Sequence, residues 1–287
     1  MTTSEPERAT MVAPRPRRTR RTRRTRSYLM AAPDHLVVEY AINPWMDPTA
    51  PFDPERAVAQ WHQLRRALQR LGHVVDVLDA VRGLPDLVFA ANGALVLGDR
   101  ALLSRFRHPE RRGEEAVHQA WLVARGIRVT QTTAPCEAEG DLLVAGRTIL
   151  AGAGPRTDAA AHDQLRTLTC REVVTLELVD PRFYHLDTAL GVVDDELVAW
   201  FPAALSQAAG EQVRRRFPDA IEVDEHDAML LGCNLVSDGT TVVVPAGVQR
   251  LAHDLRARGH AVIEVDTSEL LRAGGGPKCC TAEQHPA

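Results

Sequence analysis

Two adjacent cysteines near the end of the chain are the residues best suited to chemistry. Cys279 and Cys280 follow a glycine run in the segment GGGPKCCT, residues 274–281. Structural cysteines are seldom kept where chain ends fray, so a thiol held there favours a reactive role. The chemistry that suits it is nucleophilic attack, delivered by a segment whose glycines predict flexibility.

Four further segments concentrate the polar side chains that a cysteine nucleophile would need. They are residues 43–48 (NPWMDP), 85–93 (PDLVFAANG), 137–141 (EAEGD) and 183–188 (FYHLDT). A thiol that attacks a cationic carbon needs a histidine for proton transfer and carboxylates to hold positive charge. His185 and its acidic neighbours can supply both. Asp187, two residues later, would share the face of a strand with His185.

Each of these residues also has an ordinary structural interpretation. The chain has 11 histidines, and a single one is more often a surface or satisfied core residue. An acidic residue beside a hairpin, such as Asp187, is usually solvated, and Asp86 and Asn92 are types that turns favour. The combination of thiol, histidine and carboxylates is therefore a more specific signal than any one member.

The elements that must position these segments repeat along the chain. Apolar residues at spacings of three and four predict five helices, and β-branched runs between them predict strand pairs. The expected helices are 54–71, 110–125, 157–168, 203–217 and 247–258, and the expected pairs are 94–97 with 101–104, 142–144 with 148–151, 191–193 with 197–200 and 235–237 with 241–244. This alternation predicts an α/β body of five similar blades around a centre. A doubly wound sheet would have one strand per helix, and no glycine-rich nucleotide-binding motif is present.

The composition is that of an ordinary globular protein. The 287 residues are 45% hydrophobic and 25% charged, and no apolar run approaches the roughly 20 residues of a membrane-spanning helix. The N-terminus has no apolar stretch typical of a signal peptide, so we expect a cytoplasmic protein. The five cysteines are irregularly spaced and form no zinc-site pattern. We expect free thiols, no metal and no cofactor.

Positive charge is concentrated at the N-terminus. Residues 1–26 hold nine arginines and two glutamates, whereas the remainder holds 25 lysines and arginines against 36 acidic residues. Such an arm can bind nucleic acid or an anionic membrane surface, although it has no aromatic residue to stack on bases. Composition favours the alternative of a disordered extension. We expect a disordered basic tail over residues 1–26 and a single catalytic domain over 27–287.

Over residues 27–281 these segments, in this order, resemble the guanidine-modifying superfamily, the penteins. This group includes arginine deiminases, dimethylarginine dimethylaminohydrolases, arginine:glycine amidinotransferases and arginine dihydrolases. YLMAAPDHLVVEYAINPWM is similar to the opening of the dimethylargininase-like branch, FYHLDTAL to the catalytic-histidine segment, and GGGPKCC to the nucleophile segment. The resemblance implies a five-bladed α/β propeller with a central site. It implies that Cys279 attacks the guanidinium carbon beside its neighbour Cys280, and that His185 protonates the leaving nitrogen and then activates water.

The resemblance also implies substrate contacts. Asp86 would orient the substrate, Asn92 would contact the guanidinium, and Asn43 would join the contacts to the amino or carboxylate group. Arg111 and Arg156 would hold the α-carboxylate, which suits bidentate arginine pairing.

One acidic residue of EAEGD should pair with His185. The spacing usual in the family is shifted by one residue here, so Glu137 and Glu139 are both candidates.

Two positions favour free L-arginine as the substrate. Asn92, in VFAANG, resembles the arginine dihydrolases, whereas Asp187, in His-x-Asp, is similar to deiminases and dihydrolases. A buried carboxylate that accepts N–H bonds disfavours N-methylated nitrogens, because each methyl group removes a donor. We therefore expect hydrolysis to citrulline, or to ornithine if the ureido group is attacked again.

Other functions stay open. Within the class, dimethylargininase activity is the alternative, while an amidinotransferase is disfavoured because nothing indicates an acceptor-amine pocket. From another class comes a non-catalytic small-molecule binder that the basic arm tethers to nucleic acid. The expected partner is a small substrate, arginine or methylated arginine, with no membrane partner. A nucleic-acid partner is disfavoured, and a homo-oligomer is compatible with the sequence.

Overall fold

The computed structural model describes residues 22–287 and has an α/β fold with four sheets in that range. Its repeating unit is an antiparallel strand pair, then a helix, then a third strand that lies parallel to the second. In one such unit β3 (Ala94–Leu97) pairs with β4 (Arg100–Leu103), and α2 (Gly113–Ala124) leads to β5 (Arg128–Gln131). The helix supplies the long crossover that a parallel pair requires.

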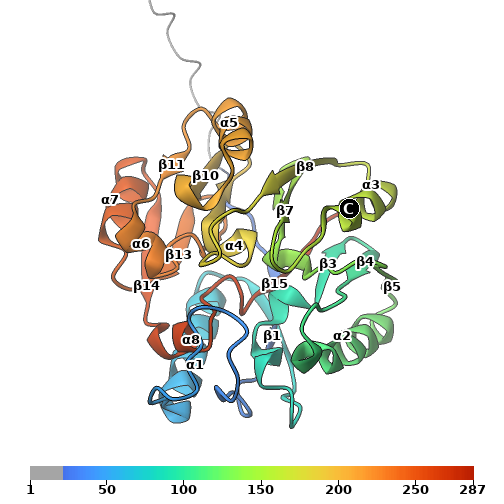
Figure 1. Cartoon of the computed structure of the whole chain (residues 1–287). Coiled ribbons are helices and arrows are strands. Elements are labelled where there is room, and N and C mark those ends of the chain that lie inside the picture. Colours follow the sequence, from blue (N-terminus) through green and yellow to red (C-terminus); the bar gives the residue numbers. More distant parts are fainter. Residues whose placement is uncertain (1–21) are drawn as a thin grey trace, which may run out of the picture.

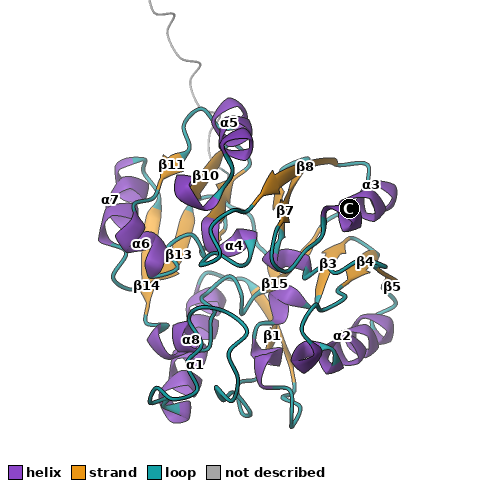
Figure 2. Cartoon of the chain, viewed as in Figure 1, coloured by secondary structure: helices purple, strands orange, loops and turns teal. Residues whose placement is uncertain are grey.

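Three more units follow with the same pairing. Their elements are β6 (Leu142–Ala145), β7 (Thr148–Ala153), α3 (Ala159–Leu168) and β8 (Glu172–Glu177), then β9 (Leu190–Asp194), β10 (Leu197–Trp200), α5 (Gln207–Arg216) and β11 (Ile221–Glu222), then β12 (Val236–Ser237), β13 (Thr241–Pro245), α7 (Gln249–Ala257) and β14 (Ala261–Val265). The long helices lie on the outside and the strands gather toward the middle (Figure 2). The predicted helices and strand pairs are confirmed, with ends that differ by a few residues.

A fifth unit combines the two ends of the chain. β15 (Ala282–His285) pairs antiparallel with β1 (Ser27–Ala31), and α1 (Pro54–Arg70) leads to β2 (Val74–Leu78), which is parallel to β1. β15 also pairs with β3, so two units share one six-stranded sheet. Figure 1 shows β15, in red, near the middle of the molecule beside β1 and β3. The segment that carries Cys279 is therefore drawn into the centre.

The sequence explains why α1 forms where it does. Asp53 accepts a hydrogen bond from the backbone N–H of Arg56 at 3.0 Å, and Pro54 occupies the first helical position. Buried Trp61, Leu64 and Leu68 lie on one face. After the helix, Gly72 adopts φ 75°, the left-handed conformation that glycine tolerates, and β2 begins at once.

Short helical turns precede the first strand of each unit, and those before β3, β6 and β9 carry several of the candidate site residues. They are η1 (Pro85–Val88) and η2 (Ala90–Asn92), η4 (Ala138–Gly140), α4 (Leu186–Ala189), α6 (Glu225–Met229) and α8 (Ser268–Arg272), while η3 (Pro109–Arg111) and η5 (Pro202–Ala204) follow second strands. The expected strand at His185 is wrong. His185 is the N-cap of α4, and Asp187 lies in its first turn. A local bond favours the turn, because the Thr188 hydroxyl donates to the His185 carbonyl at 2.6 Å.

The folded body includes residues that the sequence assigned to the tail. Residues 1–21 lie outside the described residues. Arg23 Nε donates to Asp238 at 3.0 Å, and Arg26 pairs with Glu283 at 2.7 Å. Arginines 23, 24 and 26 are thus bound by carboxylates of the body, and the domain boundary expected at residue 27 stays a prediction. Within residues 22–287, no helix has the length and apolar character needed to cross a bilayer.

Candidate active site

Cys279 lies between α8 and β15 and is 1% exposed. Its Sγ–H donates to Asp187 Oδ2 at 3.3 Å, and Asn234 Nδ2 donates to Sγ at 3.1 Å. Asn234 Oδ1 accepts the backbone N–H of Cys279 at 3.0 Å. The thiol is thus held between a carboxylate and an amide, and pairing of β15 keeps this end of the chain from fraying. Cys280 is also buried and packs in the apolar core.

The glycine run allows close packing. Gly274 has φ 96°, and a Cβ added to it would lie 2.2 Å from Asn43 Nδ2. A Cβ on Gly275 would lie 2.2 Å from the Phe89 ring. Any side chain here would therefore collide with neighbours, so the glycines serve close approach rather than the flexibility that the sequence suggested.

His185 is oriented by Glu137. His185 Nε2 lies 2.8 Å from Glu137 Oε2, which also accepts from Arg156 at 2.9 Å. Burial opposes ionisation of Glu137, but Arg156 and His185 outweigh it and hold the pKa of this carboxyl well below its usual range. An ionised Glu137 accepts a hydrogen bond from the Nε2–H group of His185. In the neutral imidazole the proton therefore stays on Nε2, and Nδ1 is the basic nitrogen.

The absence of a side chain at Gly140 lets two polar side chains approach its backbone closely. A Cβ added there would lie 2.5 Å from Asn92 Nδ2 and 2.9 Å from His185 Nδ1. Neither nitrogen has a hydrogen-bond partner among residues 22–287. The amide of Asn92 and the basic nitrogen of His185 therefore converge on one point beside the backbone of η4.

Two buried carboxyls each keep one unpaired oxygen. Asp86 Oδ2 accepts the Tyr40 hydroxyl at 3.0 Å, while Asp86 Oδ1 and Asp187 Oδ1 have no hydrogen-bond partner in the described part of the chain. Burial raises the pKa of Asp86, an effect that Arg111 partly offsets. Burial also raises the pKa of Asp187 to about 7, against the opposing charge of Lys278. Both carboxyls lack the donors that a cationic ligand would bring.

The two candidate carboxylate-binding arginines already have protein partners. Arg111 donates twice to Glu114, at 2.9 and 2.8 Å, and once to Asn92 Oδ1 at 2.8 Å. Arg156 donates to Glu137 and to the Ile42 carbonyl at 2.7 Å. A substrate carboxylate would have to displace some of these acceptors from the two guanidinium groups. The role expected for both arginines therefore stays a prediction.

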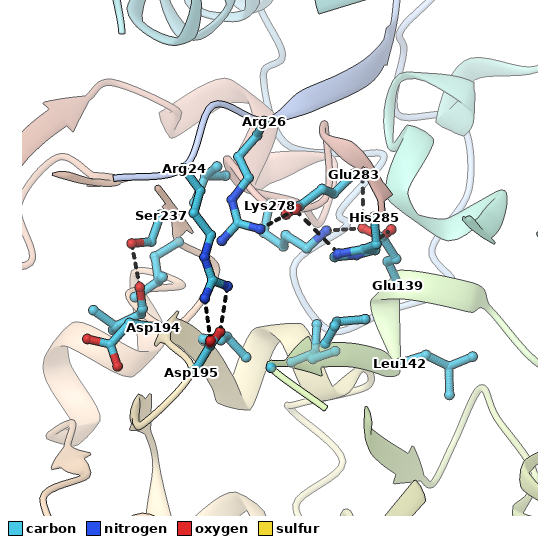
Figure 3. Close-up of a pocket in the computed structure, with 18 of the residues that line it drawn as sticks. Arg24, Arg26, Glu139, Leu142, Asp194, Asp195, Ser237, Lys278, Glu283 and His285 are labelled. Carbon is cyan, nitrogen blue, oxygen red and sulfur yellow. Dashed lines mark hydrogen bonds and ion pairs between the residues drawn. The ribbon is translucent and has the colours of Figure 1, made fainter. Parts of the chain in front are cut away.

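Glu139 and Asn43 bond to partners other than His185. Glu139 pairs with Lys278 and lies 3.3 Å from His285 Nε2 (Figure 3). Between Glu137 and Glu139, Ala138 has φ 43°, a left-handed conformation that is uncommon for a residue with a Cβ. Asn43 Oδ1 accepts the Trp45 N–H at 3.0 Å, within the segment that links β1 and α1.

One group of metal-ligating type occurs in the described part of the chain, and it lies at the start of α6. Its members are Asp224, His226 and Asp227. Asp224 caps the helix, and Asp227 accepts the Leu251 N–H at 2.8 Å. These carboxylates are engaged as backbone acceptors, and none of the predicted site residues belongs to the group.

Comparison with protein families finds a match over most of the chain. The model described as "N,N dimethylarginine dimethylhydrolase, eukaryotic" matches residues 46–285. The chain belongs to the dimethylarginine dimethylhydrolase family. The resemblance inferred from the sequence is therefore confirmed. The relatives include enzymes named dimethylarginine dimethylaminohydrolase, arginine deiminase and arginine dihydrolase, so this family member is a hydrolase of the guanidino group.

Individual relatives show which activities are named among proteins similar to this chain. It is 50% identical to N(G),N(G)-dimethylarginine dimethylaminohydrolase of Mycobacterium tuberculosis, over 91% of this chain and 86% of that protein. It is 37% identical to the bifunctional arginine dihydrolase/ornithine cyclodeaminase ArgZ of Synechocystis, over 88% of this chain and 37% of ArgZ. The substrate-bound crystal structure of the N-terminal domain of ArgZ matches with a TM-score of 0.88 and 36% identity, over 91% of this chain and 99% of that domain.

Sequence reasoning missed two residues of the candidate site in this family member. Asn234 contacts both the thiol and the backbone of Cys279, and Glu114 holds Arg111. The repeat carried a signal for Asn234, because it precedes the first strand of its unit, as Asn92 and Asp187 do in theirs. Glu114 lies at the start of α2, and nothing in the sequence indicates that this charged side chain is buried.

We expect the Cys279 thiol to react slowly with iodoacetamide at neutral pH and faster as the pH rises. Burial and the Asp187 carboxyl raise the pKa of Cys279 well above its usual value, so the thiolate forms only in alkaline solution. Asp187→Asn removes one of these causes and should shift the profile to lower pH. Peptide mass spectrometry measures the labelling, with exposed Cys170 as an internal reference. Rapid labelling of Cys279 at pH 7 in the unmodified protein would contradict this expectation.

Proposed function

We propose that the protein is a cofactor-free cysteine hydrolase of L-arginine, with its site on the axis of a five-bladed α/β propeller. The five strand–strand–helix–strand units would be the blades. The observation that carries the proposal is the 3.3 Å contact between Cys279 Sγ and Asp187 Oδ2 in a buried cluster that also holds the Glu137–His185 pair. These groups supply a nucleophile, a carboxylate for a cation and an oriented proton carrier.

In the first half of the reaction the Cys279 sulfur attacks the guanidinium carbon. The substrate cation would offset the effects that keep this thiol protonated, and thus favour the thiolate when it is bound. The thiol proton passes to His185 Nδ1, and the protonated imidazole gives it to one terminal nitrogen, so that the C–N bond breaks and ammonia leaves. An amidino-thioether on Cys279 remains.

In the second half water replaces the sulfur. His185 Nδ1 removes a proton from the water, the hydroxide adds to the same carbon, and the C–S bond breaks to restore the Cys279 thiolate. The sum is arginine and water giving citrulline and ammonia. Glu137 accepts from Nε2 throughout and so stabilises the protonated imidazole.

Unpaired acceptors favour an unsubstituted guanidinium. A guanidinium carries five N–H donors, and Asp86 Oδ1 and Asp187 Oδ1 are acceptors without partners among residues 22–287. Two methyl groups on one nitrogen would remove two donors and leave buried acceptors unpaired, which is costly. The Asn92 amide is a neutral donor that suits a ureido oxygen, and this favours a second round that yields ornithine, carbon dioxide and a second ammonia.

Dimethylarginine is the second candidate substrate. The 50% identity to the mycobacterial enzyme named for that substrate supports it. The same thiol, histidine and carboxylates would then release dimethylamine and leave citrulline.

Substrate access requires movement of the segment between β1 and α1. The Tyr40 hydroxyl bonds to Asp86, the Ile42 carbonyl accepts from Arg156, and Trp45 stands edge-on to the Tyr184 ring at 5.9 Å. These contacts cover the buried cluster. Their release would expose Arg111 and Arg156 to the substrate carboxylate, with Asn43 on the moving segment.

Product analysis tests the proposal. The protein is incubated with L-arginine or with asymmetric dimethylarginine, and citrulline, ornithine and dimethylamine are resolved. We expect citrulline or ornithine from L-arginine at a higher kcat/KM than dimethylamine from the methylated substrate. Preference for dimethylarginine would select the second candidate, and no product from either would overturn the enzyme proposal.

A further inference from the structure

A second cavity, of about 270 Å³, lies beside the terminal segment. Strands β6, β9 and β12 supply apolar walls, and Tyr28 of β1 also lines the cavity. Glu283 and His285 of β15 lie beside Lys278, which precedes that strand (Figure 3). The cavity approaches the size of small-molecule sites. Cys279, His185 and Asp187 are not among its lining residues, so it is distinct from the candidate active site.

A chain of alternating charges forms one side of this cavity. Lys278 pairs with Glu139, and Glu139 Oε1 lies 3.3 Å from His285 Nε2. His285 Nδ1 lies 3.3 Å from Glu283, which accepts from Arg26 at 2.7 Å. Burial opposes the charge on His285, but Glu283 and Glu139 outweigh it and raise the pKa of His285 to about 9. The imidazole is therefore protonated at neutral pH.

The lining carries an excess of positive charge. Five arginine and lysine side chains and protonated His285 line the cavity together with four aspartate and glutamate side chains. The excess is two positive charges, and apolar walls strengthen their field.

The lining also keeps two hydrogen-bond donors without acceptors. The Tyr28 hydroxyl and Arg26 Nε have no partner in the described part of the chain, although Tyr28 is only 1% exposed. Burial raises the pKa of Tyr28, so its hydroxyl stays protonated and able to donate. Unpaired buried donors are costly, and an acceptor in the cavity would satisfy them.

We propose that this cavity is a second binding site, for a small dianion of carboxylate or phosphate chemistry. Such a ligand balances the two excess charges and accepts hydrogen bonds from Tyr28 and Arg26. One side of the mouth is formed by Arg24, which bonds to Asp195 at 2.8 Å. Both side chains of that pair are well exposed, so solvent screens the pair and it opens at little cost. The site is independent of the reaction proposed above.

Calorimetric titration of the full chain at pH 7 and constant ionic strength tests the proposal. Inorganic phosphate and succinate distinguish the two chemistries, and acetate is the monovalent control. We expect one saturable site for at least one dianion, bound about tenfold or more tightly than acetate. Arg26→Met should weaken that binding by about tenfold or more, as expected for a lost charged hydrogen bond. Arg82→Met, which removes an exposed arginine outside the cavity lining, should leave it unchanged.

Tyr28→Phe separates binding from folding. The change removes a hydroxyl that has no partner in the described protein, so without anion the unfolding midpoint should be unchanged or higher. The rise in midpoint that phosphate or succinate causes should shrink, while turnover stays at the wild-type level. A lower midpoint without anion would show that the hydroxyl serves the fold. That result, no saturable binding of either dianion, or equal weakening by Arg82→Met would overturn the proposal.

Discussion

Replacing Cys279 with alanine is expected to lower kcat by about 10⁴-fold or more, because catalysis that forms a covalent intermediate fails without its nucleophile. The neighbouring thiol cannot substitute. Both cysteines belong to one buried apolar cluster, but Cys279 Sγ contacts Asp187 and Asn234, whereas Cys280 Sγ makes no hydrogen bond within residues 22–287. Steady-state release of ammonia measures the effect.

Cys280→Ala is the matched control. It removes the same atom one residue away and should retain most of the activity, at a cost of about 1 kcal/mol in stability for a small core cavity. Acid quenching during turnover should trap an adduct on the peptide that contains Cys279, and mass spectrometry of the Cys280→Ala protein locates it on the single remaining sulfur. Activity that survives in Cys279→Ala but is lost in Cys280→Ala would show that the other sulfur attacks.

Replacing His185 with alanine is expected to lower kcat by about 10²- to 10⁴-fold, the usual contribution of a general acid and base. Glu137→Gln should have a smaller effect in the same direction, because it leaves the imidazole in place but removes the carboxylate that accepts from Nε2. Steady-state kcat measured for both variants at one pH checks the size and order of the two effects.

The control is His62→Ala, which removes an exposed histidine on α1. It should leave kcat unchanged. A fall of less than about tenfold in His185→Ala would contradict the role proposed for His185, since general acid–base catalysis contributes more than that. Equal loss in His62→Ala would indicate a general effect on the protein.

Much of the fold could be predicted because each unit has a local signature. Helix periodicity, left-handed glycines such as Gly72 and short hairpins all act over a few neighbouring residues. The strand pair β15–β1 of the fifth unit has no such signature, since its two strands are separated by almost the whole chain. Only the resemblance and the structure bring its parts together.

The site was predictable in residue type more than in geometry. The sequence could not choose between Glu137 and Glu139, because the choice depends on the left-handed turn at Ala138, which sends the two carboxylates to different partners. The turn of α4 likewise arises from tertiary contacts, since Asp141 accepts the Leu186 N–H at 2.9 Å. The sequence alone therefore predicts a strand at His185 and Asp187.

The pairing of β15 with β1 has a consequence for biosynthesis. Four units can form as the ribosome delivers their strands, whereas the fifth must wait for the residues that follow Cys279. Its contacts span almost the entire chain, so we expect this to be the slow step of folding. Cys279 would therefore take its place last, and nascent or C-terminally shortened chains should lack the proposed activity.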